Sequence, residues 1–253
     1  MAAEYPAEMV AAQRRDIPRI TFHIQAAIEV APSKPLNELT ICDLGGGIGL
    51  FSVGCAVAGF GRVVLVDDFG DAVNRSVGDG VLKLHVTDGV QVFSRDIVDV
   101  GMNGLPEKLD VVTSFDSMEH WHRSPKALFR QVAARLTPDG GFLLGVPNNV
   151  NLRKRISVPF GYGQWSSMQD WYEPDQFRGH VREPNVADLR YIAKDMGLDE
   201  VKVFGRNWLG RGSSNGAIRW CTRIIDRPLS MFPSLCSDIY MSGRKTMSAP
   251  GLT

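Results

Sequence analysis

Residues 41–51 decide the fold, and they read Ile-Cys-Asp-Leu-Gly-Gly-Gly-Ile-Gly-Leu-Phe. An apolar run passes through an acid, Asp43, into a glycine-rich turn, and the bulky pair Leu50 and Phe51 follows. Glycines allow a tight turn and let the backbone approach a ligand without a Cβ in the way. The stretch therefore predicts a strand, a nucleotide-binding turn and the start of a helix.

The spacing of the glycines and the acid ahead of them narrow the class of ligand. Dinucleotide-binding dehydrogenases place their third glycine three residues after the second, whereas here Gly49 follows Gly47 by two. An acid beside the turn disfavours an anion and suits a ligand that carries an ammonium and a sulfonium group. The pattern resembles motif I of class I S-adenosylmethionine-dependent methyltransferases. The resemblance implies S-adenosyl-L-methionine as the cofactor.

Length and composition fit one globular enzyme. The chain has 253 residues, 44% of them hydrophobic, and a formal net charge of zero. It can bury a sizeable core, and it has no global field that would draw it to nucleic acid, so no nucleic-acid partner is expected. No apolar run approaches the roughly 20 residues of a membrane-spanning helix. Scattered cysteines without a CxxC pair, and the lack of a signal peptide, predict a cytoplasmic protein.

Strands and helices alternate in the order that a parallel sheet requires. Apolar runs predict strands at 40–43, 62–67, 90–93, 109–114, 141–146, 199–204 and 237–243. Helices are expected at 8–31, where one could cap the cofactor pocket, and at 51–58, 125–136 and 184–196, with a turn at 137–141. We expect an α/β fold with a doubly wound, mostly parallel, Rossmann-like sheet of seven strands, and the resemblance implies an antiparallel last strand.

The expected fold forms a single methyltransferase domain with three parts. Residues 1–147 would form the cofactor-binding core and residues 148–180 a lid insertion after strand five that binds the acceptor. Residues 181–253 would supply the C-terminal strands and a basic helix.

Acids stand at the ends of the first three expected strands, and these carboxyl ends meet at one edge of the sheet. These acids are Asp43, Asp67 and Asp96, with Asp68 beside Asp67. Each alone could cap a helix, but three at successive strand ends favour a ligand site. The resemblance implies that Asp67 binds both ribose hydroxyls and that Asp96 accepts from the adenine amino group. The residues that we assign to the cofactor are Asp43, Gly45, Gly47, Asp67, Asp68, Asp96, Ile97 and Phe115.

The end of the fourth expected strand supplies the candidate catalytic residues. Asp116, Glu119 and His120 stand at i, i+3 and i+4, so a helical turn would place them on one face. In one interpretation His120 or its neighbour is the general base that takes the proton from an acceptor hydroxyl. Much of the rate would come from holding the oxygen, carbon and sulfur atoms in line.

A second interpretation of the same residues is a divalent cation site. Asp116-x-x-Glu119-His120 resembles the Glu-x-x-Glu-His ligand set of small-RNA 2′-O-methyltransferases and ubiquinone-pathway O-methyltransferases. The resemblance implies that these residues hold Mg, Mn or Zn, with His180 as a further ligand, and that the ion acidifies the hydroxyl. In metal-free relatives a Glu-His pair at this point simply starts a helix.

The segment after the fifth strand contains the candidate acceptor-binding residues. Glycines separate a basic triplet at 153–155 from several aromatic side chains. Flat aromatic faces edged by hydrogen-bonding groups suit a lid over a sugar ring, and the alternative is an irregular insertion whose aromatics form a satellite core. The candidates are Arg153, Arg155, Trp165, Trp171 and Tyr172.

Residues 215–227 predict a short basic amphipathic helix. One side carries Ile218, Cys221 and Ile225, and another carries Arg219, Arg223 and Arg227. Such a helix would contact anionic lipid head groups or an acceptor's diphosphate as a peripheral membrane element. The alternative is a basic face that only water covers.

These features predict a cytoplasmic S-adenosylmethionine-dependent O-methyltransferase that acts on a hydroxyl of a sugar, glycan or lipid-linked saccharide. The strings at 165–168 and 179–183 resemble those of bacterial methyltransferases associated with polysaccharide biosynthesis. One alternative is an O-methyltransferase of a small aromatic or polyketide metabolite. Another is a non-catalytic cofactor-binding subunit, which the intact set of glycines and acids disfavours.

Overall fold

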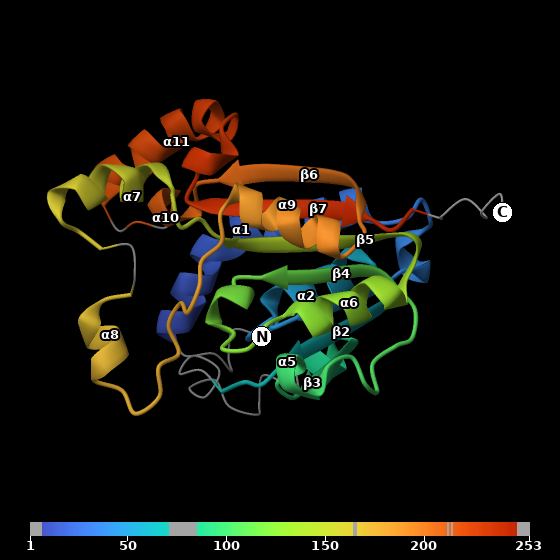
Figure 1. Ribbon diagram of the computed structural model, residues 1–253. Coiled ribbons are helices and arrows are strands. Elements are labelled where there is room, and N and C mark those ends of the chain that lie inside the picture. Colours follow the sequence, from blue (N-terminus) through green and yellow to red (C-terminus); the bar gives the residue numbers. More distant parts are fainter. Residues whose placement is uncertain (1–6, 71–84, 164–165, 212, 214, 247–253) are drawn as a thin grey trace.

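Seven strands form one sheet within residues 7–70, 85–163, 166–211, 213 and 215–246, which are the residues that the computed structural model describes. The strand order is β3-β2-β1-β4-β5-β7-β6 (Figure 1). β1 to β5 run parallel, and β7 runs antiparallel to both β5 and β6. The fold expected from the sequence is confirmed. The strands are Thr40–Leu44 (β1), Arg62–Asp67 (β2), Val90–Ser94 (β3), Leu109–Phe115 (β4), Leu136–Pro147 (β5), Asp199–Arg206 (β6) and Asp238–Arg244 (β7).

Helices cover both faces of this sheet, and each face has its own core. α1 and α2 contribute to the core on one face, and α5, α6 and α9 to the core on the other. The α-helices are Ala7–Val30 (α1), Leu50–Ala58 (α2), Ile97–Val100 (α5), Lys126–Arg135 (α6), Leu152–Ser157 (α7), Met168–Tyr172 (α8), Val186–Asp195 (α9), Trp208–Arg211 (α10) and Gly216–Ser230 (α11). Short 3₁₀ helices span Leu36–Glu38, Met118–His120, Val158–Phe160 and Pro233–Leu235.

The apolar runs of the central strands follow from this two-sided burial. Alternate side chains of a strand point to opposite faces, so Val64 and Val66 of β2 enter one core while Val63 and Leu65 enter the other. All four are at most 2% exposed. A strand covered by helices on both sides therefore needs apolar residues at every position.

β5 is longer than the sequence indicates. The strand begins at Leu136, and the expected turn at 137–141 is an irregularity within it, where the pairing with β4 changes register. Asp139 has a positive φ of 62°. Its N–H donates to the carbonyl oxygen of Lys245, and the N–H of Lys245 donates to the carbonyl oxygen of Gly140. The segment after β7 thus supplies the partners that an isolated turn would lack.

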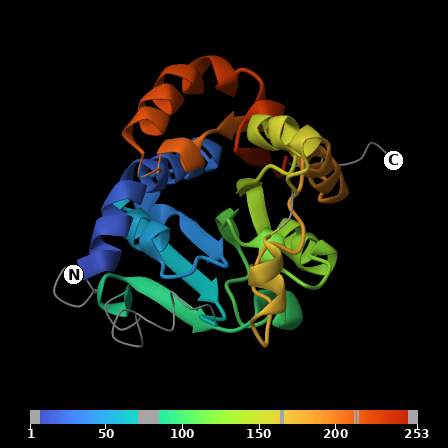
Figure 2. The ribbon, with the colours of Figure 1, turned by 90° about the vertical axis from the view of Figure 1, so that its left-hand side faces the viewer.

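The carboxyl ends of β1 to β5 meet on one side of the molecule. α7, α8, α10 and α11 gather on that side, on the left of Figure 1 and toward the viewer in Figure 2. No helix in the described part of the chain is both long enough and apolar enough to cross a membrane.

Candidate active site

A cavity of about 440 Å³ lies where β1 to β4 end. Its wall begins with Gly45 and Gly47 of the glycine-rich turn and continues with the acids that follow β2 and β3. Side chains between positions 116 and 123, after β4, form the next part. Gln176 and Arg178, from the segment between α8 and α9, complete it. The volume is that of a small-molecule site.

The glycine-rich turn and Asp67 hold each other in place. Gly45, Gly47 and Gly49 have φ angles of 70°, 55° and 75°, a region that side chains with a Cβ rarely adopt. The N–H of Gly47 donates to Oδ2 of Asp67 over 2.8 Å. A Cβ on Gly45 would collide with the side chain of Ser117. The turn therefore brings bare backbone to the cavity wall, next to an anchored carboxylate.

Asp43 lies beneath this turn and is not among the residues that line the cavity. Its carboxylate accepts hydrogen bonds from Ser52 Oγ at 3.0 Å and from Thr113 Oγ1 at 2.9 Å. Burial raises the pKa of Asp43 to about 7, although both hydrogen bonds favour the ionised form. The acid ties β1 to α2 and β4, so its position differs from the direct cofactor contact expected from the sequence.

The other acids of the expected cofactor set lie on the wall. Asp96 accepts hydrogen bonds from the N–H groups of Val98 and Asp99, so it caps α5 and also lines the cavity. Ile97 lines the cavity and is only 3% exposed. Oδ2 of Asp68 lies 3.3 Å from a guanidinium nitrogen of Arg178. Helix capping and a ligand site are therefore compatible at this edge.

Phe115 does not line the cavity but belongs to an aromatic cluster under α1. Its ring stacks on His23 with centroids 3.9 Å apart, and it contacts Phe51 and Tyr240 edge-on. Burial, with a smaller effect from the charge of Arg19, holds the pKa of His23 well below its usual range. The neutral imidazole and the rings around it fix α1 against the ends of β4 and β7.

Asp116 follows β4 with a positive φ of 48° and lines the cavity. Its carboxylate forms an ion pair with Arg19 of α1. The leading helix therefore reaches the site through a side chain. The helical turn that follows spans only Met118–His120, so Asp116 lies before it and the helical face expected to be shared with Glu119 and His120 does not form.

Glu119, His120 and His180 form a cluster in which one potential ligand atom from each residue lies within 4.8 Å of the others. Nδ1 of His120 lies 2.8 Å from the carbonyl oxygen of Arg178, so this nitrogen carries the proton. The two imidazole rings are 4.8 Å apart. Oε2 of Glu119 is buried and has no hydrogen-bond partner among the described residues, and burial raises the pKa of Glu119 to about 8.

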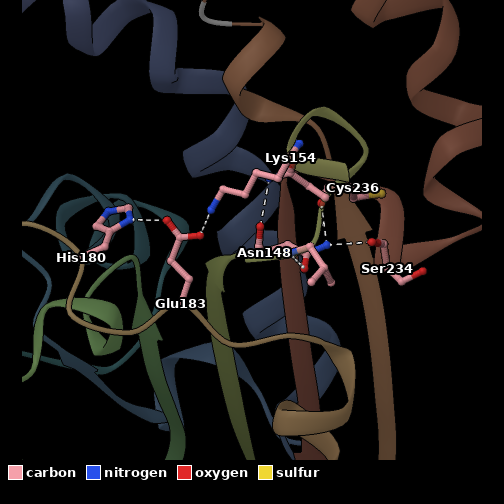
Figure 3. A network of polar contacts seen from close by, with 8 residues as sticks. Asn148, Lys154, His180, Glu183, Ser234 and Cys236 are labelled. Atoms are coloured by element: carbon pink, nitrogen blue, oxygen red, sulfur yellow. Dashed lines mark hydrogen bonds and ion pairs between the residues drawn. The ribbon is translucent and has the colours of Figure 1, made fainter. Parts of the chain in front are cut away.

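A network of polar contacts extends from His180 of this cluster to Asn148 and Cys236 (Figure 3). Nδ1 of His180 lies 2.7 Å from Glu183, and the ammonium group of Lys154 contacts the other oxygen of the same carboxylate. Burial opposes ionisation of Glu183, but hydrogen bonds from His180 and Lys154 outweigh it and lower its pKa. Asn148, below Lys154 in the figure, donates to the carbonyl oxygen of Cys236 at 2.9 Å.

None of the expected acceptor-binding residues that the structure describes lines the cavity. Trp171 and Tyr172 lie on α8 with 57% and 72% of their surface exposed, and neither lines the cavity. Arg153 is exposed, whereas Arg155 donates to the backbone carbonyls of Val150 and Ser234. Trp165 lies outside the described residues.

Sequence reasoning missed several residues of the wall, including Arg95, Ser117, Gln176 and Arg178. Arg178 is the most informative of them, because its side chain contacts Asp68 while its carbonyl oxygen contacts His120. Its position two residues before His180 was the available signal. Because the contacts of Arg178 join two segments that are far apart in the sequence, no local sequence motif includes them.

Comparison with known proteins agrees with this geometry. The profile of a family described as "Methyltransferase domain" matches residues 14–203. Among solved structures, a SAM-dependent methyltransferase from Archaeoglobus fulgidus has 16% identity and a TM-score of 0.58, and the match covers 95% of this chain and 100% of that one. No curated protein matches the sequence.

Two further solved structures resemble the chain. One is an S-adenosylmethionine-dependent methyltransferase from Mesorhizobium loti, with 16% identity, a TM-score of 0.56 and coverage of 91% of this chain and 97% of that one. The other is magnesium protoporphyrin IX methyltransferase from Synechocystis PCC 6803 with bound SAH, with 15% identity, a TM-score of 0.54 and coverage of 96% and 89%. At these identities the likeness concerns the fold.

Proposed function

The chain belongs to the methyltransferase domain family, and we propose that it transfers the methyl group of S-adenosylmethionine to a hydroxyl group of a small polar acceptor, such as a sugar. The expected class, an S-adenosylmethionine-dependent methyltransferase with this cofactor, is confirmed by the family match and the fold. The acceptor is our own inference. It rests on one observation, the pair of imidazoles next to the cavity at the end of β4.

The cofactor would lie along the wall formed by the glycine-rich turn. In this proposal Asp67 accepts from the ribose hydroxyls, and the hydrogen bond that its carboxylate accepts from the N–H of Gly47 supports this role by fixing the carboxylate beforehand. Asp96 would accept from the adenine amino group while Ile97 packs against the ring. When bound, S-adenosylmethionine supplies a methyl group on a positively charged sulfur.

The residues after β4 would then act on the acceptor. A hydroxyl group has a pKa far above neutral, so it needs a base to remove its proton during attack on the methyl carbon. His120 lines the cavity and holds its proton on Nδ1, through the contact with the Arg178 carbonyl, so the lone pair is on Nε2. In this proposal Nε2 takes the proton. Asp116 and Arg178 would orient the acceptor from either side.

The same residues support a second version in which a divalent cation assists. The buried oxygen of Glu119 without a partner, and His180 oriented by the carboxylate of Glu183, are features of ligands in metal sites. Glu119, His120 and His180 would hold the ion, whose chemistry there would be to acidify the hydroxyl. Asp116 would not be a ligand in this version, because it pairs with Arg19.

One experiment tests the proposal and separates the versions. Purified protein is incubated with methyl-labelled S-adenosylmethionine and a panel of sugars, sugar phosphates, phenols and amines, with and without chelator. We expect transfer to a hydroxyl acceptor, and loss of about 100-fold or more in turnover for His120→Ala with unchanged cofactor affinity. His122→Ala is the matched control, since His122 also lines the cavity but lies outside the cluster.

The response to chelation separates the base from the ion. If activity survives chelation, His120 removes the proton from the acceptor without the help of an ion. If chelation abolishes activity and Mg or Mn restores it, a divalent cation takes part in the reaction. In that case Glu119→Ala and His180→Ala should both be inactive. Transfer only to amines, or a fully active His120→Ala enzyme, would contradict the proposal.

A further inference from the structure

Helix α11 has its polar residues inside and its apolar residues outside. Its buried side chains are Thr222 and Asp226, at 8% and 5% exposure. Trp220 and Ile224, one helical turn apart on the opposite face, are 65% and 54% exposed. This arrangement reverses the usual pattern, in which the apolar stripe of a surface helix faces the core.

Buried polar contacts fix α11 in this orientation. The carboxylate of Asp226 accepts a hydrogen bond of 3.0 Å from Asn207 and forms an ion pair with Arg211 of α10. Thr222 packs so close to Gly210 that a Cβ there would collide with its hydroxyl. Turning the apolar face inward would bury Trp220 at the cost of exposing this network and leaving its charges unpaired. The outward face is therefore a stable feature of the fold.

The rest of the outward face is apolar with a cationic edge. Met231 and Phe232, directly after the helix, are 76% and 59% exposed. Arg223 and Arg227 are exposed beside Trp220 and Ile224. Asp226 is the only acid of the helix, and its charge is buried against Arg211. The exposed surface of α11 thus combines a large apolar area with positive charge only.

Helix α11 lies on the side of the molecule where the parallel strands end, together with α7 and α8 (Figures 1 and 2). The segment that contains these two helices exposes more large side chains, among them Val158, Phe160 and Tyr162 at 40%, 75% and 70%. Apolar residues on both α11 and this segment therefore flank the end of the sheet that carries the cavity. None of the described residues covers the outer face of α11.

We propose that this face, consisting of Trp220, Ile224, Met231 and Phe232 with Arg223 and Arg227, docks on the surface of an anionic phospholipid bilayer. A helix with a tryptophan-bearing apolar face and arginines at its edge lies in the interfacial plane of a membrane, where the apolar side chains enter the acyl boundary and the cations meet phosphates. This docking does not depend on the acceptor proposed above.

The charges disfavour a second copy of the chain as the occupant. A two-fold interface sets the same patch against itself, so Arg223 and Arg227 would meet a patch whose exposed part offers no acid to pair with them. An anionic bilayer matches both the apolar face and the cationic edge.

Cosedimentation of the whole protein with vesicles tests the proposal. We expect binding to vesicles that contain phosphatidylglycerol, weak binding to pure phosphatidylcholine, and a decline as salt screens the arginines. Arg223→Gln with Arg227→Gln should lower the partition coefficient roughly 25-fold, from about fivefold per arginine. Trp220→Ser with Ile224→Ser should lower it at least about tenfold on both lipids.

Matched controls are available on α9, which packs on a face of the sheet and has exposed side chains of the same kinds. Tyr191→Ser and Arg190→Gln should leave vesicle binding unchanged. Cys221 provides a direct probe, because it is the exposed one of the four cysteines. An environment-sensitive dye on Cys221 should shift to the blue when anionic vesicles are added.

Three results would overturn the proposal. The first is no binding to anionic vesicles by the wild-type protein. The second is binding that the α9 variants lose as much as the α11 variants do. The third is a concentration-dependent dimer, measured by sedimentation velocity, that Trp220→Ser with Ile224→Ser dissociates in the absence of any vesicle binding.

Discussion

The acids at the ends of β2 and β3, on the proposed cofactor side of the cavity, are held by main-chain N–H groups. The polar groups around His120 and His180, the histidine side, are held by segments far away in the sequence. Asp67 accepts from the N–H of Gly47 and that of Phe69, and Asp96 accepts from its own helix. His120, by contrast, contacts residue 178, and Glu183 contacts Lys154. The first side is a product of strand-turn-helix geometry, and the second depends on how distant segments pack.

This difference means that damage to the two sides should be separable. Substitutions on the cofactor side should change cofactor affinity and leave acceptor kinetics alone, while those on the histidine side should do the reverse.

The largest effect is expected for Asp67→Ala. Loss of the ribose hydrogen bonds to one carboxylate should cost on the order of 2 to 4 kcal/mol of binding free energy. The dissociation constant for S-adenosylmethionine should therefore rise roughly 30- to 900-fold. Isothermal calorimetry with the cofactor and its demethylated product measures it. Asp68→Ala, whose charge is partly engaged by Arg178, should lose less. If the acceptor KM of Asp67→Ala rises by the same factor as its dissociation constant for the cofactor, the two sides of the cavity are not separable.

Glu183→Gln should reduce turnover on the order of tenfold, because the ring of His180 loses its charged partner. Cofactor affinity should not change. The ¹⁵N chemical shifts of His180 provide a readout apart from activity, since the wild-type protein should hold the proton on Nδ1 and the variant should show a mixture of tautomers. The prediction fails if the tautomer is unchanged while turnover falls.

Glu119→Gln should raise stability at high pH. The pKa of Glu119 is about 8 in the folded protein against 4.5 in its ordinary environment. Between these values the folded state keeps a proton that the unfolded state has lost, so stability falls as pH rises through this window. The neutral glutamine lacks this penalty, and its Tm should exceed that of the wild type near pH 8, by roughly 2–4 °C per kcal/mol recovered.

The check on Glu119 is a series of melting curves from pH 5 to pH 8. The difference in Tm between Glu119→Gln and the wild type should grow as pH rises. Glu173→Gln, at an exposed position, should show a constant difference. If the difference in Tm between Glu119→Gln and the wild type shrinks as pH rises, Glu119 is ionised and paired in the folded protein, as a metal ligand would be.

The smallest effect is expected for Trp171→Ala. The side chain is 57% exposed and lies off the cavity wall, so the acceptor KM should change by less than about twofold, in line with a surface substitution worth under about 0.5 kcal/mol. Arg178→Ala, on the wall, should have a clearly larger effect on the same constant. If Trp171→Ala is the more damaging of the two, α8 closes over the acceptor during turnover.

The location of the glycines and of the acids at the ends of β2 and β3 on the cavity wall followed from the sequence, because its determinants are contiguous; their contacts with the cofactor stay a prediction. Each acid stands at or near the end of an apolar strand, and the parallel order of strands places those ends at one edge. Asp43 is the exception. A motif shows that an acid precedes the turn, but the hydrogen bonds of Ser52 and Thr113 that draw it inward come from another helix and another strand.

The histidine side and α11 were predicted less well for the same physical reason. The basic triplet looked uniform, yet Lys154 turns inward to Glu183 while Arg153 stays exposed. The periodicity of residues 215–227 indicated an amphipathic helix but not which face is buried. That choice was made by Asn207 and Arg211, whose contacts with Asp226 outweigh the pull of the apolar residues toward the core.

The position of β7 has a consequence for synthesis on the ribosome. This strand follows every other strand along the chain, yet it lies between β5 and β6. Until residues 238–244 leave the exit tunnel, the apolar strand β5 has one unpaired edge, and β6 has no strand to pair with. The glycine-rich turn can form early, but the nascent sheet stays unfinished and prone to pair with other chains. Chains stalled before residue 238 should therefore be digested by protease that full-length chains resist.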